Sequence, residues 1–149
     1  MDIPLRTHAI TQARPAHLRY SRTWDAGVSS IAEARDAVGA LLARARPAPG
    51  RRSVQDAQLV VSELVTNAAK HAPGPCALRL ELPPGAGTLL ITVTDTSRQA
   101  PRRRTPDPGR IGGHGLLLVS MLSRELEVTW LPRGKRVTAT VPLAPAAAC

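Results

Sequence analysis

One helical segment of this 149-residue chain carries polar residues whose types and spacing could bind a metal ion and a phosphate group. Glu63 and Asn67 lie four residues apart on a stripe beside the apolar face of residues 57–68, and Lys70 and His71 continue that stripe one turn later. A carboxylate and an amide at the edge of a core are unfavourable unless something satisfies them, and a hydrated metal ion with a phosphate ligand would do so. A solvated helix face with an i,i+4 polar pair is the alternative, and for this segment alone it is the better explanation.

Two later segments favour the phosphate interpretation. Residues 89–95 are a β-rich run that ends in an aspartate, and residues 109–119 are a glycine-rich loop that opens into an apolar helix. Gly112, Gly113 and Gly115 let the backbone approach phosphate oxygens closely, and the following helix offers unpaired N–H groups and the positive end of its dipole. A flexible loop before a helix would also contain glycines. However, the chain has no Walker A sequence and no Rossmann fingerprint, so this loop is its only credible phosphate cradle.

The elements that must position these residues follow from hydrophobic periodicity, capping and turn signals. The expected order is strand, helix, helix, strand, strand, helix, strand, strand, over residues 18–24, 30–46, 53–72, 77–82, 88–94, 116–124, 126–130 and 136–143. Ser30 and Glu33 match a capping box, and Ser53 is expected to cap the second helix. This order predicts an α+β two-layer sandwich, with helices on one face of a mixed, mostly antiparallel sheet. The domain would span residues 18–143, between flexible tails at residues 1–17 and 144–149.

In order and spacing, the three segments resemble the N, G1 and G2 boxes of the GHKL ATP-binding superfamily, which includes gyrase, MutL and the histidine kinases. Within it, the sequence Glu-Leu-Val-Thr-Asn-Ala-Ala-Lys-His-Ala of residues 63–72 looks most like the small bacterial anti-sigma-factor serine/threonine kinases. The resemblance covers roughly residues 18–143. It implies the same α+β fold and a site for ATP and Mg²⁺.

The resemblance also implies a role for each matching residue. Asp95 would accept a hydrogen bond from the adenine amino group, Asn67 would bind Mg²⁺, and Lys70 would point toward the phosphates. An amide oxygen is an adequate ligand, because Mg²⁺ keeps several waters and takes other ligands from phosphates. Glu63 would activate a serine or threonine hydroxyl of a protein substrate. The other expected nucleotide contacts are Ser97, Arg110, Gly112, Gly113, Gly115, Leu116 and Thr138.

One of these positions departs from the family pattern. Ser97 stands two residues after the acid of the G1 box, where the family often has glycine. Serine constrains the backbone more than glycine does, although its hydroxyl can add a polar contact.

Composition limits the other function classes. The formal charge of +9, from 20 basic and 11 acidic side chains, favours polyanionic or acidic partners. Tyr20, Trp24 and Trp130 are too few and too scattered for a base-stacking platform, which argues against nucleic-acid binding. No apolar run approaches a membrane span and no secretory signal is present, which predicts a cytoplasmic protein without membrane contact. Cys76 and Cys149 show no metal-binding spacing and are expected to be free thiols.

The sequence therefore predicts an ATP- and Mg²⁺-dependent serine/threonine kinase of the anti-sigma-factor type. Its expected partners are a sigma factor, an anti-sigma-factor antagonist that it phosphorylates, or both, and a homodimer is possible. At 149 residues, we expect neither the phosphoacceptor helix of a histidine kinase nor the transducer domain of gyrase and MutL. Two alternatives remain open: a non-catalytic ATP-binding regulator that sequesters its partner, and a basic nucleic-acid-binding protein.

Overall fold

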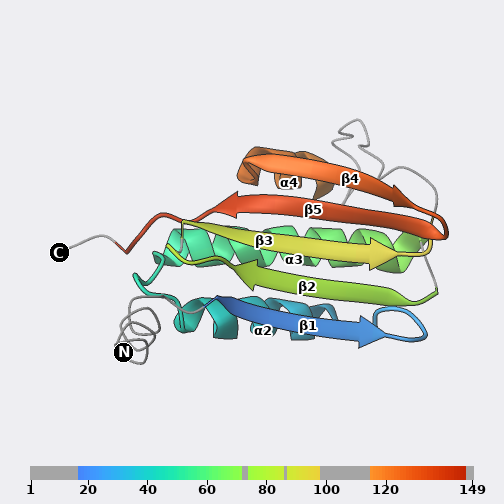
Figure 1. Ribbon diagram of the computed structural model, residues 1–149, viewed down its shortest axis with the longest axis horizontal. Helices are drawn as coiled ribbons and strands as arrows, with labels where there is room; N and C mark the ends of the chain where they lie inside the picture. The colour runs from blue at the N-terminus through green and yellow to red at the C-terminus, as the bar shows by residue number, and fades with distance from the viewer. Residues whose placement is uncertain (1–16, 72–73, 86, 98–114, 147–149) are drawn as a thin grey trace, which may run out of the picture.

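A computed structural model describes residues 17–71, 74–85, 87–97 and 115–146, which form a sheet covered by helices on one face (Figure 1). The strands are β1 (Leu18–Trp24), β2 (Cys76–Leu82), β3 (Thr88–Asp95), β4 (Glu125–Leu131) and β5 (Gly134–Pro142). The helices are α2 (Ile31–Ala43), α3 (Arg51–His71) and α4 (Gly115–Leu122). No helix among these residues is long and apolar enough to cross a membrane.

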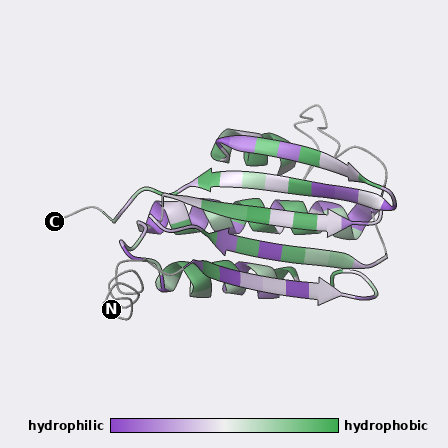
Figure 2. Ribbon diagram, viewed as in Figure 1, coloured by the Kyte–Doolittle hydropathy of each residue, from purple (hydrophilic) through white to green (hydrophobic). Residues whose placement is uncertain are grey.

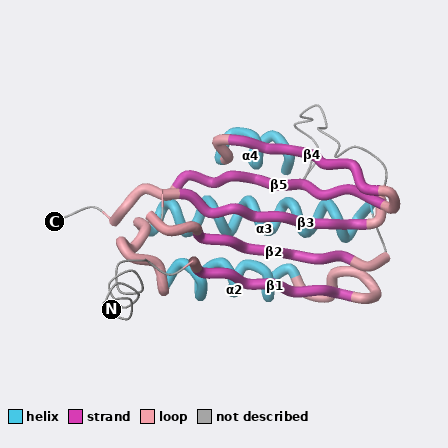
Figure 3. The backbone as a smooth tube through the Cα atoms, viewed as in Figure 1, coloured by secondary structure: helices cyan, strands magenta, loops and turns pink. Residues whose placement is uncertain are grey.

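The five strands lie in the order β1-β2-β3-β5-β4. Each neighbouring pair is antiparallel, so the described part of the sheet has no parallel pair where a mixed sheet was expected. The predicted element order and α+β two-layer architecture are confirmed. Figure 3 shows the three helices together behind the sheet.

The core lies between the helices and the inner face of the sheet. Along β3 and β5, buried residues alternate with half-buried or exposed ones, and this alternation is the reason that one sheet face excludes water. Figure 2 shows the corresponding change between hydrophobic and hydrophilic residues along the strands. The apolar stripe of α3 packs against this inner face. Its buried apolar residues are Ala57, Val60, Val61, Leu64, Val65 and Ala68.

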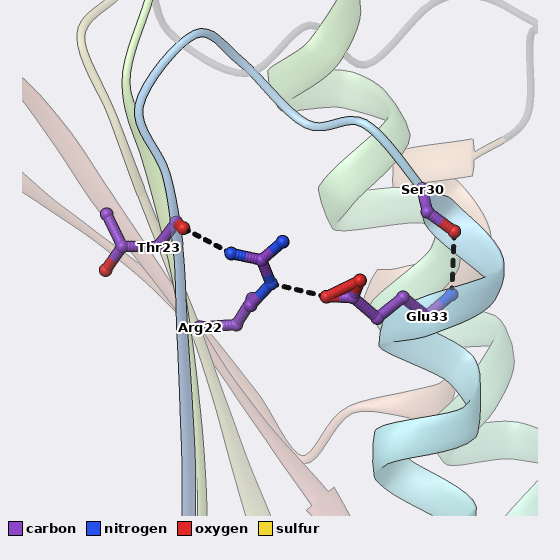
Figure 4. A network of polar contacts seen from close by, with 4 residues as sticks. All are labelled: Arg22, Thr23, Ser30 and Glu33. Carbon is purple, nitrogen blue, oxygen red and sulfur yellow. Dashed lines mark hydrogen bonds and ion pairs between the residues drawn. The ribbon is translucent and has the colours of Figure 1, made fainter.

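The start of α2 is fixed by side chains from two elements (Figure 4). Ser30 is the N-cap, and its Oγ accepts a hydrogen bond from the backbone N–H of Glu33 at 3.1 Å. The Glu33 carboxylate accepts a hydrogen bond from Arg22 of β1, and the Arg22 guanidinium also donates to the Thr23 carbonyl. The Ser30 side chain therefore makes its capping-box hydrogen bond, whereas the Glu33 side chain joins α2 to β1 through Arg22.

Ser53 does not cap α3, contrary to the sequence-based expectation. The helix begins at Arg51, so Ser53 already lies in its first turn. Its hydroxyl donates to the carbonyl of Ala144 at 3.4 Å and accepts from the N–H of Ala144 at 2.8 Å. The serine is used for a contact with the C-terminal segment, a long-range bond that local spacing does not reveal.

The residues after β5 are held against the connection between α2 and α3. Gly50 N–H donates to the Ala144 carbonyl at 2.8 Å, and Ala146 N–H donates to the Ala48 carbonyl at 2.9 Å. These bonds anchor residues 144–146, the first half of the segment expected to be a flexible tail. Residues 147–149 and residues 1–16 of the expected N-terminal tail lie outside the described residues.

Candidate functional site

The polar stripe of α3 lies at the edge of the core, as its spacing predicts. Glu63 and Asn67 are half-buried beside the buried apolar stripe, Lys70 is exposed and His71 is half-buried. In Figure 1, the C-terminal ends of α3 and β3 lie at the same end of the molecule, and α3 packs against β3. The fold thus brings this stripe and Asp95 to one end of the domain.

Asp95 is the last residue of β3 and is buried. Its carboxylate accepts hydrogen bonds from the Lys135 ammonium at 3.0 Å to Oδ1 and 3.0 Å to Oδ2. Oδ1 also accepts the backbone N–H of Ser97 at 2.9 Å. The two side chains of the ion pair are 4% and 3% exposed, so water screens their attraction little.

Lys135 is the functional candidate that sequence reasoning missed. It lies directly opposite Asp95 in the β3–β5 pairing, and it continues toward the start of β5 the alternation that buries Val137 and Ala139 on the inner face. That alternation was the available signal, because a lysine at a core-facing position needs a counter-charge. Its partner could not be named without the register of two strands separated by about 40 residues of chain.

Gly134 allows β5 to approach the end of β3 at this point. Its φ is 154°, and a Cβ on this residue would lie 1.9 Å from the carbonyl oxygen of Asp95. Any larger residue would therefore have to move the backbone of Asp95. The glycine is one of the conditions for the Asp95–Lys135 contact.

Other side chains extend this part of the inner face across the sheet. Trp24 of β1 pairs with Cys76 of β2, and Lys135 of β5 pairs with Trp130 of the edge strand β4. Burial raises the pKa of the Cys76 thiol to about 11, with a further rise from the Asp95 charge and an opposing effect from Lys135. Trp24 is 4% exposed and Trp130 is 47% exposed. These cross-strand neighbours therefore form a row across the inner face that is buried at the β1 edge and exposed to solvent at the β4 edge.

The structure does not bring Thr138 together with Asp95. Lys135, Val137 and Ala139 face the helices, so Thr138 lies on the opposite face of the sheet. There its hydroxyl is 3.4 Å from that of Thr92, its cross-strand partner on β3. The inner-face position of β5 directly opposite Asp95 is Lys135.

The remaining predicted nucleotide contacts are described only in part. Leu116 is buried in α4, which packs against α3, and Gly115 is the first residue of that helix. The backbone N–H of Ser97 binds Asp95, so this residue supports the carboxylate through its main chain. Arg110, Gly112 and Gly113 lie outside the described residues.

A cavity of about 440 Å³ adjoins the same end of the sheet. Three of its lining residues, Thr23, Ala77 and Thr94, are cross-strand neighbours whose side chains lie on the face away from the helices. Asp95 also borders this cavity, along with Pro132 and other residues. Cys76 and Asp95, whose side chains lie on the inner face, are thus among the residues that line the cavity.

The donor set suits a metal ion that arrives with its own ligands. Among the described residues, no group of three or more His, Cys, Asp and Glu side chains could hold a metal by itself. Asn67 offers a single amide oxygen beside the Glu63 carboxylate, both half-buried on α3. Such a site fits Mg²⁺, which keeps waters and shares the phosphates of a nucleotide, rather than a metal held in an all-protein cage.

Comparisons with known proteins agree with this arrangement. The sequence matches the family described as the histidine kinase-like ATPase domain over residues 25–141. None of the curated proteins compared with the chain matches it.

Among solved structures, the chain is similar to the crystal structure of the RsbU and RsbW domains of Rv1364c from Mycobacterium tuberculosis, with a TM-score of 0.62 and 21% sequence identity. The match covers 87% of this chain and 33% of that chain, so this protein spans about a third of its length. A second similar structure is the histidine kinase domain from the Erythrobacter litoralis EL346 blue-light activated histidine kinase. Its TM-score is 0.45 at 23% identity, over 79% of this chain and 66% of that chain.

At 21% identity, the mycobacterial structure is evidence for the fold, and the family match provides the relationship. The match spans both helices and strands of the candidate site, from the end of β1 to the end of β5. It confirms the resemblance that the order of the Glu63, Asp95 and glycine-loop segments predicted. The protein belongs to the histidine kinase-like ATPase domain family.

Proposed function

We propose that the protein is a cytoplasmic, ATP- and Mg²⁺-dependent serine/threonine kinase of the anti-sigma-factor type. Its substrate would be an anti-sigma-factor antagonist protein, and a sigma factor would be its other partner. The observation that carries the proposal is the placement of Glu63 and Asn67, one turn apart and half-buried in the C-terminal half of α3, a helix that runs toward the end of the domain where β3 also ends.

Each residue has a role that its position supports. Asp95 would accept the amino group of adenine, Asn67 would give its amide oxygen to Mg²⁺, and the exposed Lys70 would reach toward the phosphates. When bound, Mg²⁺ would neutralise charge on the triphosphate. Glu63 would accept the proton of the substrate hydroxyl while the oxygen forms a bond to the γ-phosphorus and the bond to the ADP oxygen breaks.

The charge of the chain supports an acidic partner. A formal charge of +9 accelerates association with an acidic protein surface and also attracts the triphosphate. The same charge would attract nucleic acid, but the three aromatic residues do not form a stacking platform: Trp24 is buried, Tyr20 is half-buried and Trp130 stands on the opposite edge strand.

A specific observation favours a second candidate, a non-catalytic ATP-binding regulator. The Asp95 carboxylate already holds Lys135 and the Ser97 N–H, so the anchor for adenine is partly occupied by the protein itself. Weak binding or slow exchange of the nucleotide would be compatible with a protein that regulates its partner by sequestering it and not by phosphorylating it. The two candidates differ in the need for a general base.

Phosphate transfer separates these candidates. The protein is purified from its host with its bound partner, and transfer from labelled ATP is compared between wild type and Glu63→Ala. We expect a loss of transfer of about 100-fold or more, because a general base acts in the transition state, while ATP affinity stays within about twofold. Glu127→Ala, an exposed position on β4, is the matched control and should retain wild-type transfer.

Two outcomes would contradict the proposal. Equal transfer by wild type and Glu63→Ala would remove the base role from Glu63. If the wild type binds ATP but transfers no phosphate to any bound partner, the non-catalytic regulator is the better description.

A further inference from the structure

We infer that Lys135 reads the nucleobase together with Asp95, its ammonium group donating to a ring nitrogen that flanks the amino group held by Asp95. This inference rests on the proposed function, because it takes Asp95 as the adenine anchor. It adds a specificity-determining residue at a position where neither the sequence motifs nor the comparisons assign one.

The hydrogen-bonding capacity of the pair is the first argument. An ammonium group has three donors, and Lys135 uses two of them on Oδ1 and Oδ2 of Asp95. Oδ1 also accepts the backbone N–H of Ser97, whereas Oδ2 accepts only from Lys135 among the residues that the structure describes. Among the described residues, the structure gives the Lys135 ammonium no partner besides Asp95. One donor on Nζ and one acceptor position on Oδ2 therefore remain side by side.

The position of the pair is the second argument. Both side chains lie on the inner face at the end of β3 and the start of β5, and the inner face is the side on which α3 packs with Glu63 and Asn67. Next to Lys135 the sheet opens toward the edge strand, where Trp130 is 47% exposed. Both side chains of the pair thus point toward the helix layer.

The complementarity with a purine is the third argument. Adenine presents an exocyclic amino group that donates, flanked by ring nitrogens N1 and N7 that accept. An acceptor on Asp95 next to a donor on Lys135 matches this edge with two bonds, whereas a lone carboxylate could make only one. A site built with paired polar groups rejects ligands that leave one of those groups unsatisfied.

Atom replacement in the nucleotide tests the inference without altering the protein. Calorimetric titration of the wild-type protein in Mg²⁺ would compare ATP with 1-deaza-ATP, 7-deaza-ATP and 3-deaza-ATP. We expect one of the first two to bind about tenfold more weakly than ATP, because a charge-assisted hydrogen bond is lost. The matched control is 3-deaza-ATP, since N3 does not flank the amino group, and it should bind like ATP.

A protein variant then assigns the effect to Lys135. Lys135→Met should bind ATP more weakly than wild type and should no longer distinguish it from the sensitive deaza analogue. Because that variant leaves Asp95 unpaired, Lys135→Met combined with Asp95→Asn provides a second, uncharged version of the same test, and it should likewise lose the discrimination.

The possible failures can be told apart. If the wild type binds ATP but binds both 1-deaza-ATP and 7-deaza-ATP equally well, Lys135 does not contact the base and the pair only joins β3 to β5. Discrimination that persists unchanged in the two variants would also overturn the inference. No binding of ATP at all would contradict the proposed function itself.

Discussion

At the level of single residues, the Asp95–Lys135 pair stabilises the fold only while both charges are present. Removal of one partner leaves the other charge buried and unpaired, which typically costs about 3–5 kcal/mol, whereas replacing both by neutral groups is often tolerated. The side chains are 4% exposed for Asp95 and 3% exposed for Lys135, so a charge left without its partner is poorly hydrated. The coupling between the two sites should therefore be large.

A double-mutant cycle measures this coupling. Lys135→Met should lower the free energy of unfolding in urea by about 3–5 kcal/mol, and the combination with Asp95→Asn should recover much of that loss. The matched control is Arg136→Met, at the neighbouring exposed position of β5, which should change stability by less than about 0.5 kcal/mol. Additive effects of the two core substitutions would contradict a direct charge pairing.

Cys76 gives a pH dependence whose sign follows from its environment. Its thiol has a pKa of about 11 in the folded protein, compared with 9.0 for an ordinary thiol. Below about pH 9 the Cys76 thiol is protonated in both the folded and the unfolded protein, so its full contribution to folding stability is present. Between the two values the unfolded chain releases the proton first, so stability falls as the pH rises.

Urea unfolding at about pH 8 and about pH 10.5 checks this effect. The wild type should lose roughly 2 kcal/mol more than Cys76→Ala over that interval, in proportion to the difference in pKa. Cys149→Ala removes the other cysteine of the chain and should keep the wild-type loss. If Cys76→Ala shows the same loss as wild type, another group causes the dependence.

The sequence revealed some of these residues and not others for a physical reason. Glu63 and Asn67 are close along a helix, so their spacing alone predicted a shared edge of the core. Lys135 and Thr138 depend on the register and parity of β5, where a shift by one residue exchanges the inner and outer faces. Thr138 lies on the outer face of the sheet, away from the Asp95 side chain, and Lys135 was missed.

At the level of elements, the hairpin between β4 and β5 determines where Lys135 lies. Gly134 has a φ of 154°, and a Cβ at this residue would overlap the Asp95 carbonyl oxygen at 1.9 Å. Gly134→Ala should therefore destabilise the protein by several kcal/mol, about 2–4, through backbone strain and displacement of the ion pair. Gly87→Ala is the matched control, because nothing lies within 4 Å of its Cβ position.

Thermal unfolding of both variants tests this prediction. Gly87→Ala should unfold within a degree or two of the wild type, and Gly134→Ala should unfold many degrees lower. A Gly134→Ala protein with wild-type stability would mean that the hairpin can move away from Asp95 at little cost.

The order of elements was predictable because each helix and strand carries its own periodicity. The buried stripe of α3 recurs at helical spacing and the buried residues of β3 alternate, so both could be identified locally. The ends were less predictable. Ser53 looked like a cap by its type, but its hydroxyl binds Ala144, a residue 91 positions away. The same contact anchors a segment that composition alone assigned to a tail.

At the level of the whole molecule, the formal charge of +9 and the ATPase fold make different predictions about ligands. A basic surface binds any polyanion, and the affinity falls steeply with salt concentration. A nucleotide site also uses the base, through contacts such as those proposed for Asp95 and Lys135. Inorganic tripolyphosphate carries the phosphate charge without the base and is therefore a suitable comparison.

Thermal unfolding with Mg²⁺ and either ATP or tripolyphosphate decides between these descriptions. ATP at about 100 times its dissociation constant should stabilise the folded state by about 2.7 kcal/mol, which raises the midpoint by roughly 5–10 °C for a domain of this size. Tripolyphosphate at the same concentration should give a smaller shift that disappears in about 0.5 M salt, while much of the ATP effect should remain, because buried contacts are screened less than surface charges. Equal shifts for the two ligands, both abolished by salt, would mean that the protein binds polyanions through its basic surface and has no functional adenine site.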